Sequence, residues 1–194
     1  MKLIIITLIV IAIAPAILYG NSNGPPSGYA NNAPSYNNCT TCHSGSANSG
    51  DGEIFFTGLP DSYVSGVSYT IGITVTGANN RGYGYQAAAQ IGDVTAGAFN
   101  LIENSSGSEL NGDFIQQNTR LENGSWTFEW TAPANTTENI VFSASGLATG
   151  GSTGTSGDEV YTTQIEVPAQ SVSLEDNIKI SALNIHSSFP NPFN

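Results

Sequence analysis

The chain has 194 residues, with 15 acidic and 4 basic side chains and a formal net charge of −11 at neutral pH. This length suits one domain with appendages, and so few cations exclude a basic patch for nucleic acid or for an anionic membrane surface. Only 10% of the residues are charged, and the 22 glycines, with many Ser, Thr and Asn residues, are typical of an exported β protein rich in turns.

Residues 1–20 predict a secretory signal peptide. Lys2 supplies a short positive region, and residues 3–18 form an apolar run that is followed by the small, polar stretch GNSNG. We expect cleavage after Gly20. An uncleaved membrane anchor is the alternative, although the run is short for a span of about 20 residues. The membrane then matters only for export or for surface anchoring.

Residues 21–52 predict an irregular loop segment, because they are rich in Asn, Gly, Ser and Pro and show no periodicity. Both cysteines of the chain lie in this segment, in the run CTTCH formed by Cys39 to His43. C-x-x-C-H is the attachment signature of c-type haem. Its two cysteines form thioethers with the haem, and the adjacent histidine is the axial ligand of the iron. We therefore predict haem c on Cys39 and Cys42, with His43 at the iron.

Other hypotheses for the same run remain open. A Cys39–Cys42 disulfide suits an oxidising compartment but leaves His43 without a role. A zinc or copper site needs more ligands, and the only other histidine, His186, is far along the chain. A thioredoxin-like redox site fits poorly because no βαβ pattern surrounds the motif. The haem hypothesis itself leaves the sixth iron ligand open, since Met1 is the only methionine and leaves with the signal peptide.

From residue 53 onward, apolar and polar residues alternate with the period of two expected for half-buried strands. Because each strand has one apolar face to bury, the strands must close into a barrel or pack as two sheets. We favour an all-β, immunoglobulin-like (Reeler-like) β-sandwich of seven to eight strands over residues 53–167. The predicted strands cover residues 53–58, 67–76, 83–91, 97–102, 113–118, 125–131, 139–145 and 159–167.

Two further groups of residues are candidates for a ligand-binding or metal-binding role. In SWTFEWT, Trp126, Phe128 and Trp130 share one face, and we assign them to the core rather than to an aromatic ligand groove. The Gly-rich acidic loop GSTGTSGDEVY, with Asp158 and Glu159, is a possible Ca²⁺ site, and a solvated hairpin loop is the alternative. No Ser–His–Asp set is available in the domain, so we expect an electron-transfer or binding protein rather than a hydrolase.

Four stretches together resemble the bacterial choice-of-anchor V domain, which is similar to the eukaryotic Reeler domain. They are GPPSGYANNAPSYNNCTTCHSG, GLPDSYVSGVSYTIGITV, WTFEWTAP and SGDEVYTTQIEV, and they span roughly residues 24–167. The resemblance implies an immunoglobulin-like sandwich on an exported, surface-attached protein, with the C-x-x-C-H run as part of the domain. Members often carry a His-Thr pair before the Trp strand, where this chain has Asn118-Thr119. If that histidine binds iron in relatives, this chain lacks the ligand and has an open coordination site.

Residues 168–194 begin as a polar linker, and the tail LNIHSSFPNPFN resembles the opening of the type IX secretion sorting domain. The rest of that domain is missing, so we expect the chain to be truncated. The resemblance implies a protein secreted by a Gram-negative bacterium or held on its outer surface. The functional prediction is extracytoplasmic electron transfer or haem-based sensing, with a redox partner. The alternative is a non-enzymatic surface binding or adhesion module for a surface ligand, with Cys39 and Cys42 in a disulfide.

Overall fold

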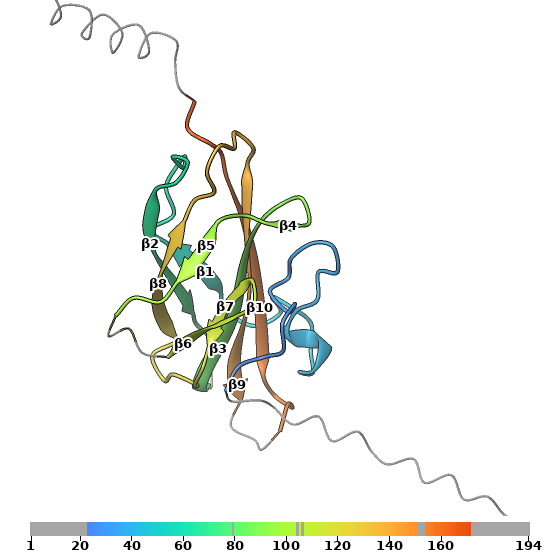
Figure 1. Cartoon of the computed structure of the whole chain (residues 1–194). Coiled ribbons are helices and arrows are strands. Elements are labelled where there is room, and N and C mark those ends of the chain that lie inside the picture. The colour runs from blue at the N-terminus through green and yellow to red at the C-terminus, as the bar shows by residue number, and fades with distance from the viewer. Residues whose placement is uncertain (1–22, 79, 104, 106, 151–153, 172–194) are drawn as a thin grey trace, which may run out of the picture.

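The computed structural model of the chain describes residues 23–78, 80–103, 105, 107–150 and 154–171. The predicted signal peptide, the sorting motif and His186 lie outside these residues. In the described part, ten strands and one 3-10 turn are present, and the strands form two antiparallel sheets (Figure 1). The predicted all-β sandwich is confirmed. No helix with the length and apolar character needed to cross a membrane occurs among the described residues.

The four-stranded sheet has the order β1-β2-β8-β5. The period-two prediction holds in its two central strands, where Tyr69 pairs with Trp130 and Ile71 with Phe128. Alternate side chains of these strands therefore point between the sheets. The strands of this sheet are β1 (Ile54–Thr57), β2 (Ser68–Val75), β8 (Ser125–Thr131) and β5 (Ala98–Asn100).

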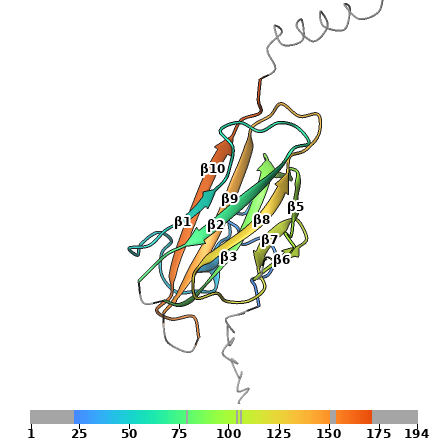
Figure 2. The same cartoon turned by 90° about the vertical axis from the view of Figure 1, so that its left-hand side faces the viewer.

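The larger sheet has the order β10-β9-β3-β7-β6, and the short β4 pairs with β3 outside this path. Figure 2 shows β9, β10 and β3 running along the length of the molecule. The sequence did not predict β4 and β6, which contain few buried apolar residues and are held by pairing with their neighbours. The strands are β10 (Glu159–Val167), β9 (Ile140–Gly150), β3 (Asn80–Ile91), β7 (Phe114–Gln117), β6 (Ser108–Asn111) and β4 (Val94–Thr95).

Aromatic side chains fill the space between the sheets. Trp130 is fully buried, its ring centroid lies 4.8 Å from that of Phe142, and its indole N–H donates to the carbonyl of Ala96 at 3.0 Å. Trp126 packs 4.6 Å from Tyr85. The core assignment of the SWTFEWT aromatics is therefore confirmed. Burying each such side chain stabilises the fold by about 1.5–3 kcal/mol.

Residues 23–53, here called the N-terminal arm, cover the outer face of the six-stranded sheet (Figure 1, blue). The arm is irregular, as predicted, yet it is firmly bound. Gln86 of β3 is 0% exposed; its Oε1 accepts the N–H of Tyr29 at 2.6 Å and its Nε2 donates to the carbonyl of Pro26 at 2.9 Å. Gln90 donates to the carbonyl of Ala33 at 3.1 Å. Both faces of β3 are thus buried, one against the core and one under the arm.

Candidate functional site

The C-x-x-C-H run forms one tight turn on the outer face of the six-stranded sheet. Its first residues make the 3-10 turn η1 (Cys39–Thr41), which Asn38 caps by accepting the N–H of Thr40 at 3.0 Å. The N–H groups of Cys42 and His43 both donate to the carbonyl of Cys39, at 3.3 and 2.9 Å. The turn therefore holds the two cysteines and the histidine in one short segment.

Cys39 faces β9, where it meets Ser145. The N–H of Cys39 donates to the Ser145 hydroxyl oxygen at 3.1 Å, and the hydroxyl donates to the Cys39 sulfur at 3.1 Å. Burial raises the pKa of the Cys39 thiol to about 11, although the bond from Ser145 partly offsets this. The thiol is therefore neutral and a poor nucleophile at physiological pH. Both Cys39 and Cys42 are free thiols in this structure, and the disulfide hypothesis stays a prediction.

His43 contacts an aspartate that lies 115 positions later in the chain. Its Nδ1 lies 2.6 Å from Oδ2 of Asp158, whose side chain is only 4% exposed. The second oxygen of Asp158 accepts the N–H of Gly150 at 2.7 Å. A carboxylate that faces Nδ1 fixes the proton on that nitrogen and leaves the lone pair on Nε2. Among the described residues, none forms a hydrogen bond with Nε2.

The chain after the motif is tied to the loop before β10 and to β10 itself. Both the N–H and the hydroxyl of Ser44 donate to the carbonyl of Thr155, each at 3.2 Å. Further along, the N–H of Asn48 donates to the carbonyl of Val160 at 2.8 Å, and the N–H of Thr162 donates to Oδ1 of Asn48 at 2.9 Å. These bonds attach the chain after His43 to residues on both sides of Asp158 in the sequence, and so support the His43–Asp158 contact.

The loop predicted as a calcium site uses its carboxylates for internal bonds. Asp158 binds His43 and Gly150, and Oε2 of Glu159 accepts the hydroxyl of Tyr161 at 2.7 Å. Residues 151–153 of the loop lie outside the described residues, and calcium binding there stays a prediction. Within the described ranges, no three His, Cys, Asp or Glu side chains gather as a metal site.

Asn118, the residue that the sequence resemblance places at a histidine position, is not joined to the C-x-x-C-H turn by a described contact. It is exposed just beyond β7, and its side chain donates to the carbonyl of Ser108 at 3.2 Å. The residues that do contact the motif, Ser145 and Asp158, were not predicted as partners. Asp158 is 115 positions from His43, and nothing in the sequence relates the two.

Comparison with protein-family models finds no match, and neither does comparison with curated proteins. Among solved structures, the chain is similar to the Reelin-N domain of F-spondin, with 16% identity and a TM-score of 0.49 over 68% of this chain and 95% of that one. It is similar to the human F-spondin reeler domain, with 17% identity and a TM-score of 0.48 over 65% and 95%. A conjugative transposon lipoprotein from Bacteroides eggerthii follows, with 16% identity and a TM-score of 0.37 over 60% and 95%. Likeness of this degree says nothing about what the chain binds.

Proposed function

We propose that this protein is an exported, cell-surface domain that carries one c-type haem on Cys39 and Cys42, with His43 as the axial ligand, and that it acts in electron transfer or haem-based sensing. The observation that carries the proposal is the His43–Asp158 pair. A metal-binding histidine characteristically donates its second ring N–H to a carboxylate or a carbonyl. His43 has this partner at 2.6 Å and leaves Nε2 for the iron.

The donor set of the turn fits a covalently bound haem. Two thiols at the C-x-x-C spacing and an adjacent imidazole are the groups that such a haem needs. Cys42 and His43 are half-buried and Thr41 is exposed, so a group held here lies at the surface of the domain. When bound, the haem supplies a one-electron redox centre. A surface position suits electron exchange with a partner protein.

The protein's own residues have distinct tasks in this proposal. Asp158 orients the imidazole and keeps its proton on Nδ1, while Gly150 fixes Asp158 in turn. A hydrogen bond to a charged, buried group is worth about 1.5–3 kcal/mol, which is enough to hold one ring orientation. Ser145 anchors Cys39 to β9 and so sets the distance of the turn from the sheet.

Export and surface attachment belong to the same proposal. They are supported by the signal-peptide pattern of residues 1–20, by the resemblance of residues 24–167 to choice-of-anchor V domains and by the sorting motif at residues 189–194. The low number of cations and the abundance of turn-forming residues agree with an extracytoplasmic β domain.

Intact mass of the protein from a host with c-type maturation machinery tests the proposal. Covalent haem adds about 616 Da, whereas a disulfide removes about 2 Da. We expect the added mass, a Soret band and pyridine-haemochrome peaks, and we expect all three to vanish in the Cys39→Ser/Cys42→Ser double variant. Ser46→Ala, at an exposed position outside the motif, should keep them. A colourless protein that is about 2 Da light from this host rules out haem and supports the surface-binding alternative.

A further inference from the structure

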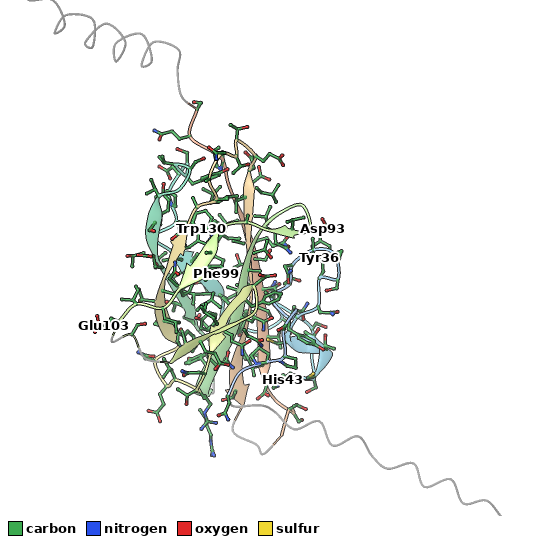
Figure 3. All side chains as sticks on the ribbon, in the orientation of Figure 1. Tyr36, His43, Asp93, Phe99, Glu103 and Trp130 are labelled. Atoms are coloured by element: carbon green, nitrogen blue, oxygen red, sulfur yellow. The ribbon has the colours of Figure 1, made fainter. Side chains whose placement is uncertain are left out.

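The pair formed by His43 and Asp158 lies outside the core of the sandwich. In Figure 3, His43 lies on the arm side of the molecule, apart from Trp130, which is buried between the sheets. Even so, the side chain of Asp158 is only 4% exposed and that of His43 is 16% exposed. Withdrawing a charge from water is costly unless it is paired and hydrogen-bonded, so this pair is a candidate for a functional role.

Both carboxylate oxygens of Asp158 have a partner. Oδ2 lies 2.6 Å from Nδ1 of His43, and Oδ1 accepts the N–H of Gly150 at 2.7 Å. The two contacts are made by different segments, the arm and the end of β9. The carboxylate therefore cannot turn away from the imidazole without losing a hydrogen bond.

No arginine neutralises the charge of Asp158. Arg81 and Arg120 are the cationic residues in the described part of the chain, and neither forms an ion pair there. The one ion pair among the described residues is that between His43 and Asp158. The negative charge of Asp158 thus acts on the imidazole, and at a site with so little exposure it is weakly screened by water and salt.

A carboxylate beside one ring nitrogen of a histidine changes how the other nitrogen binds a metal. Donation of the ring N–H to a carboxylate makes the imidazole a more basic ligand. Ferric iron carries one more positive charge than ferrous iron, so a more basic ligand and a nearby negative charge stabilise the ferric form more strongly. Hydrogen bonds to the axial ligand are accordingly one of the means by which a protein sets the reduction potential of a haem.

We propose that Asp158, acting through His43, lowers the reduction potential of the haem and so keeps its iron ferric at rest. This inference rests on the proposed function, and it makes Asp158 a positioning residue whose charge matters as well as its hydrogen bond. It also separates the two roles proposed above. Gases such as CO bind to ferrous haem iron, so an iron that is ferric at rest favours one-electron transfer over the sensing of a gas.

The reduction potentials of haem-loaded wild type and Asp158→Asn, measured by spectroelectrochemical titration, test this inference. Asparagine has the shape of aspartate but carries no charge. We expect the equilibrium between ferric and ferrous iron to shift toward the ferrous form at least tenfold, which is about 59 mV for one electron. Glu159→Gln is the matched control, because it removes an equal charge at the next residue, whose carboxylate binds Tyr161 and not His43. We expect it to shift the equilibrium by less than about twofold.

A second measurement needs neither haem nor a variant. Nitrogen NMR of the haem-free protein shows which ring nitrogen of His43 carries a proton. We expect a proton on Nδ1, the nitrogen that faces Asp158. An Nδ1 without a proton overturns the inference, because the carboxylate then accepts no hydrogen bond from the ring.

The other outcomes separate this inference from the proposed function. The inference alone is wrong if Asp158→Asn takes up haem and keeps the potential of the wild type, or if the wild type isolated in air has a ferrous spectrum. It is also wrong if Glu159→Gln raises the potential as much as Asp158→Asn, since the effect is then one of net charge. A wild type that carries no covalent haem overturns the proposed function together with the inference.

Discussion

Replacing Gln86 with alanine removes the buried amide through which the sheet binds the arm. The side chain makes three hydrogen bonds, with the Tyr29 N–H at 2.6 Å, the Pro26 carbonyl at 2.9 Å and Oε1 of Gln116 at 2.7 Å. Each buried partner left unsatisfied costs about 1–3 kcal/mol, so the loss of the two bonds to the arm gives about 2–6 kcal/mol in docking free energy of the arm. A typical domain is stabilised by about 5–15 kcal/mol in total, so this cost is a large part of that free energy.

The arm should detach before the sandwich unfolds, because the strands keep their own core. Native-state hydrogen exchange of the Cys39 and Asn48 amides, which donate to β9 and β10, measures the opening of the arm, and urea unfolding measures the sandwich. We expect exchange at both amides to rise at least about thirtyfold in Gln86→Ala, while the amide of Phe128 in β8 changes far less.

Gln164→Ala is the matched control for this prediction. Its amide also binds the arm, through the carbonyl of Asn31 at 2.8 Å, but the residue is exposed, so water can replace the lost bond. We expect a change below about 0.5 kcal/mol. A Gln86→Ala protein with a stability loss under about 1 kcal/mol and unchanged exchange at Cys39 and Asn48 refutes the docking account.

Three further outcomes follow from the geometry. Trp130→Phe should lower the free energy of unfolding in urea by about 2–3 kcal/mol, because the indole N–H loses its bond to Ala96. Trp126→Phe should lower it clearly less, because the Trp126 indole N–H is buried without a partner and loses no bond. Equal losses in the two variants would contradict this reasoning. In protein made without haem, iodoacetamide at pH 8 should label Cys42 well before Cys39, and labelling of Cys39 should accelerate only as the pH approaches its pKa of about 11. Gly112→Ala should lower the melting temperature through a cost of about 1–2 kcal/mol, since the backbone is left-handed there although the space is open.

Strands with a clear alternation and turn residues at both ends can be predicted from the sequence alone. β8 and β10 begin and end where the pattern does, because each buries one apolar face. The second buried face of β3 could not be predicted, since Gln86 and Gln90 look like solvent-facing residues until the arm is in place. β4 and β6 have little pattern of their own and exist through their pairing with longer strands.

The candidate site likewise has one part that could be predicted from the sequence and one part that could not. Cys39, Cys42 and His43 are contiguous, so their gathering is a local matter of one turn. The contact between His43 and Asp158 is not local, since the loop between β9 and β10 carries the aspartate back to the arm. A sequence pattern with a period of two holds no information about which loop carboxylate meets a distant imidazole.

The glutamine side chains of the sheet form their hydrogen bonds to the arm with backbone atoms. Gln86 binds the N–H of Tyr29 and the carbonyl of Pro26, Gln90 binds the carbonyl of Ala33, and Gln164 binds the carbonyl of Asn31. Backbone groups are the same whatever side chain they carry. The side chains at arm positions such as Tyr29 and Ala33 can therefore be exchanged during evolution or in the laboratory without loss of these bonds, while the buried Gln86 and Gln90 cannot, and the same sandwich can carry arms that differ at these positions.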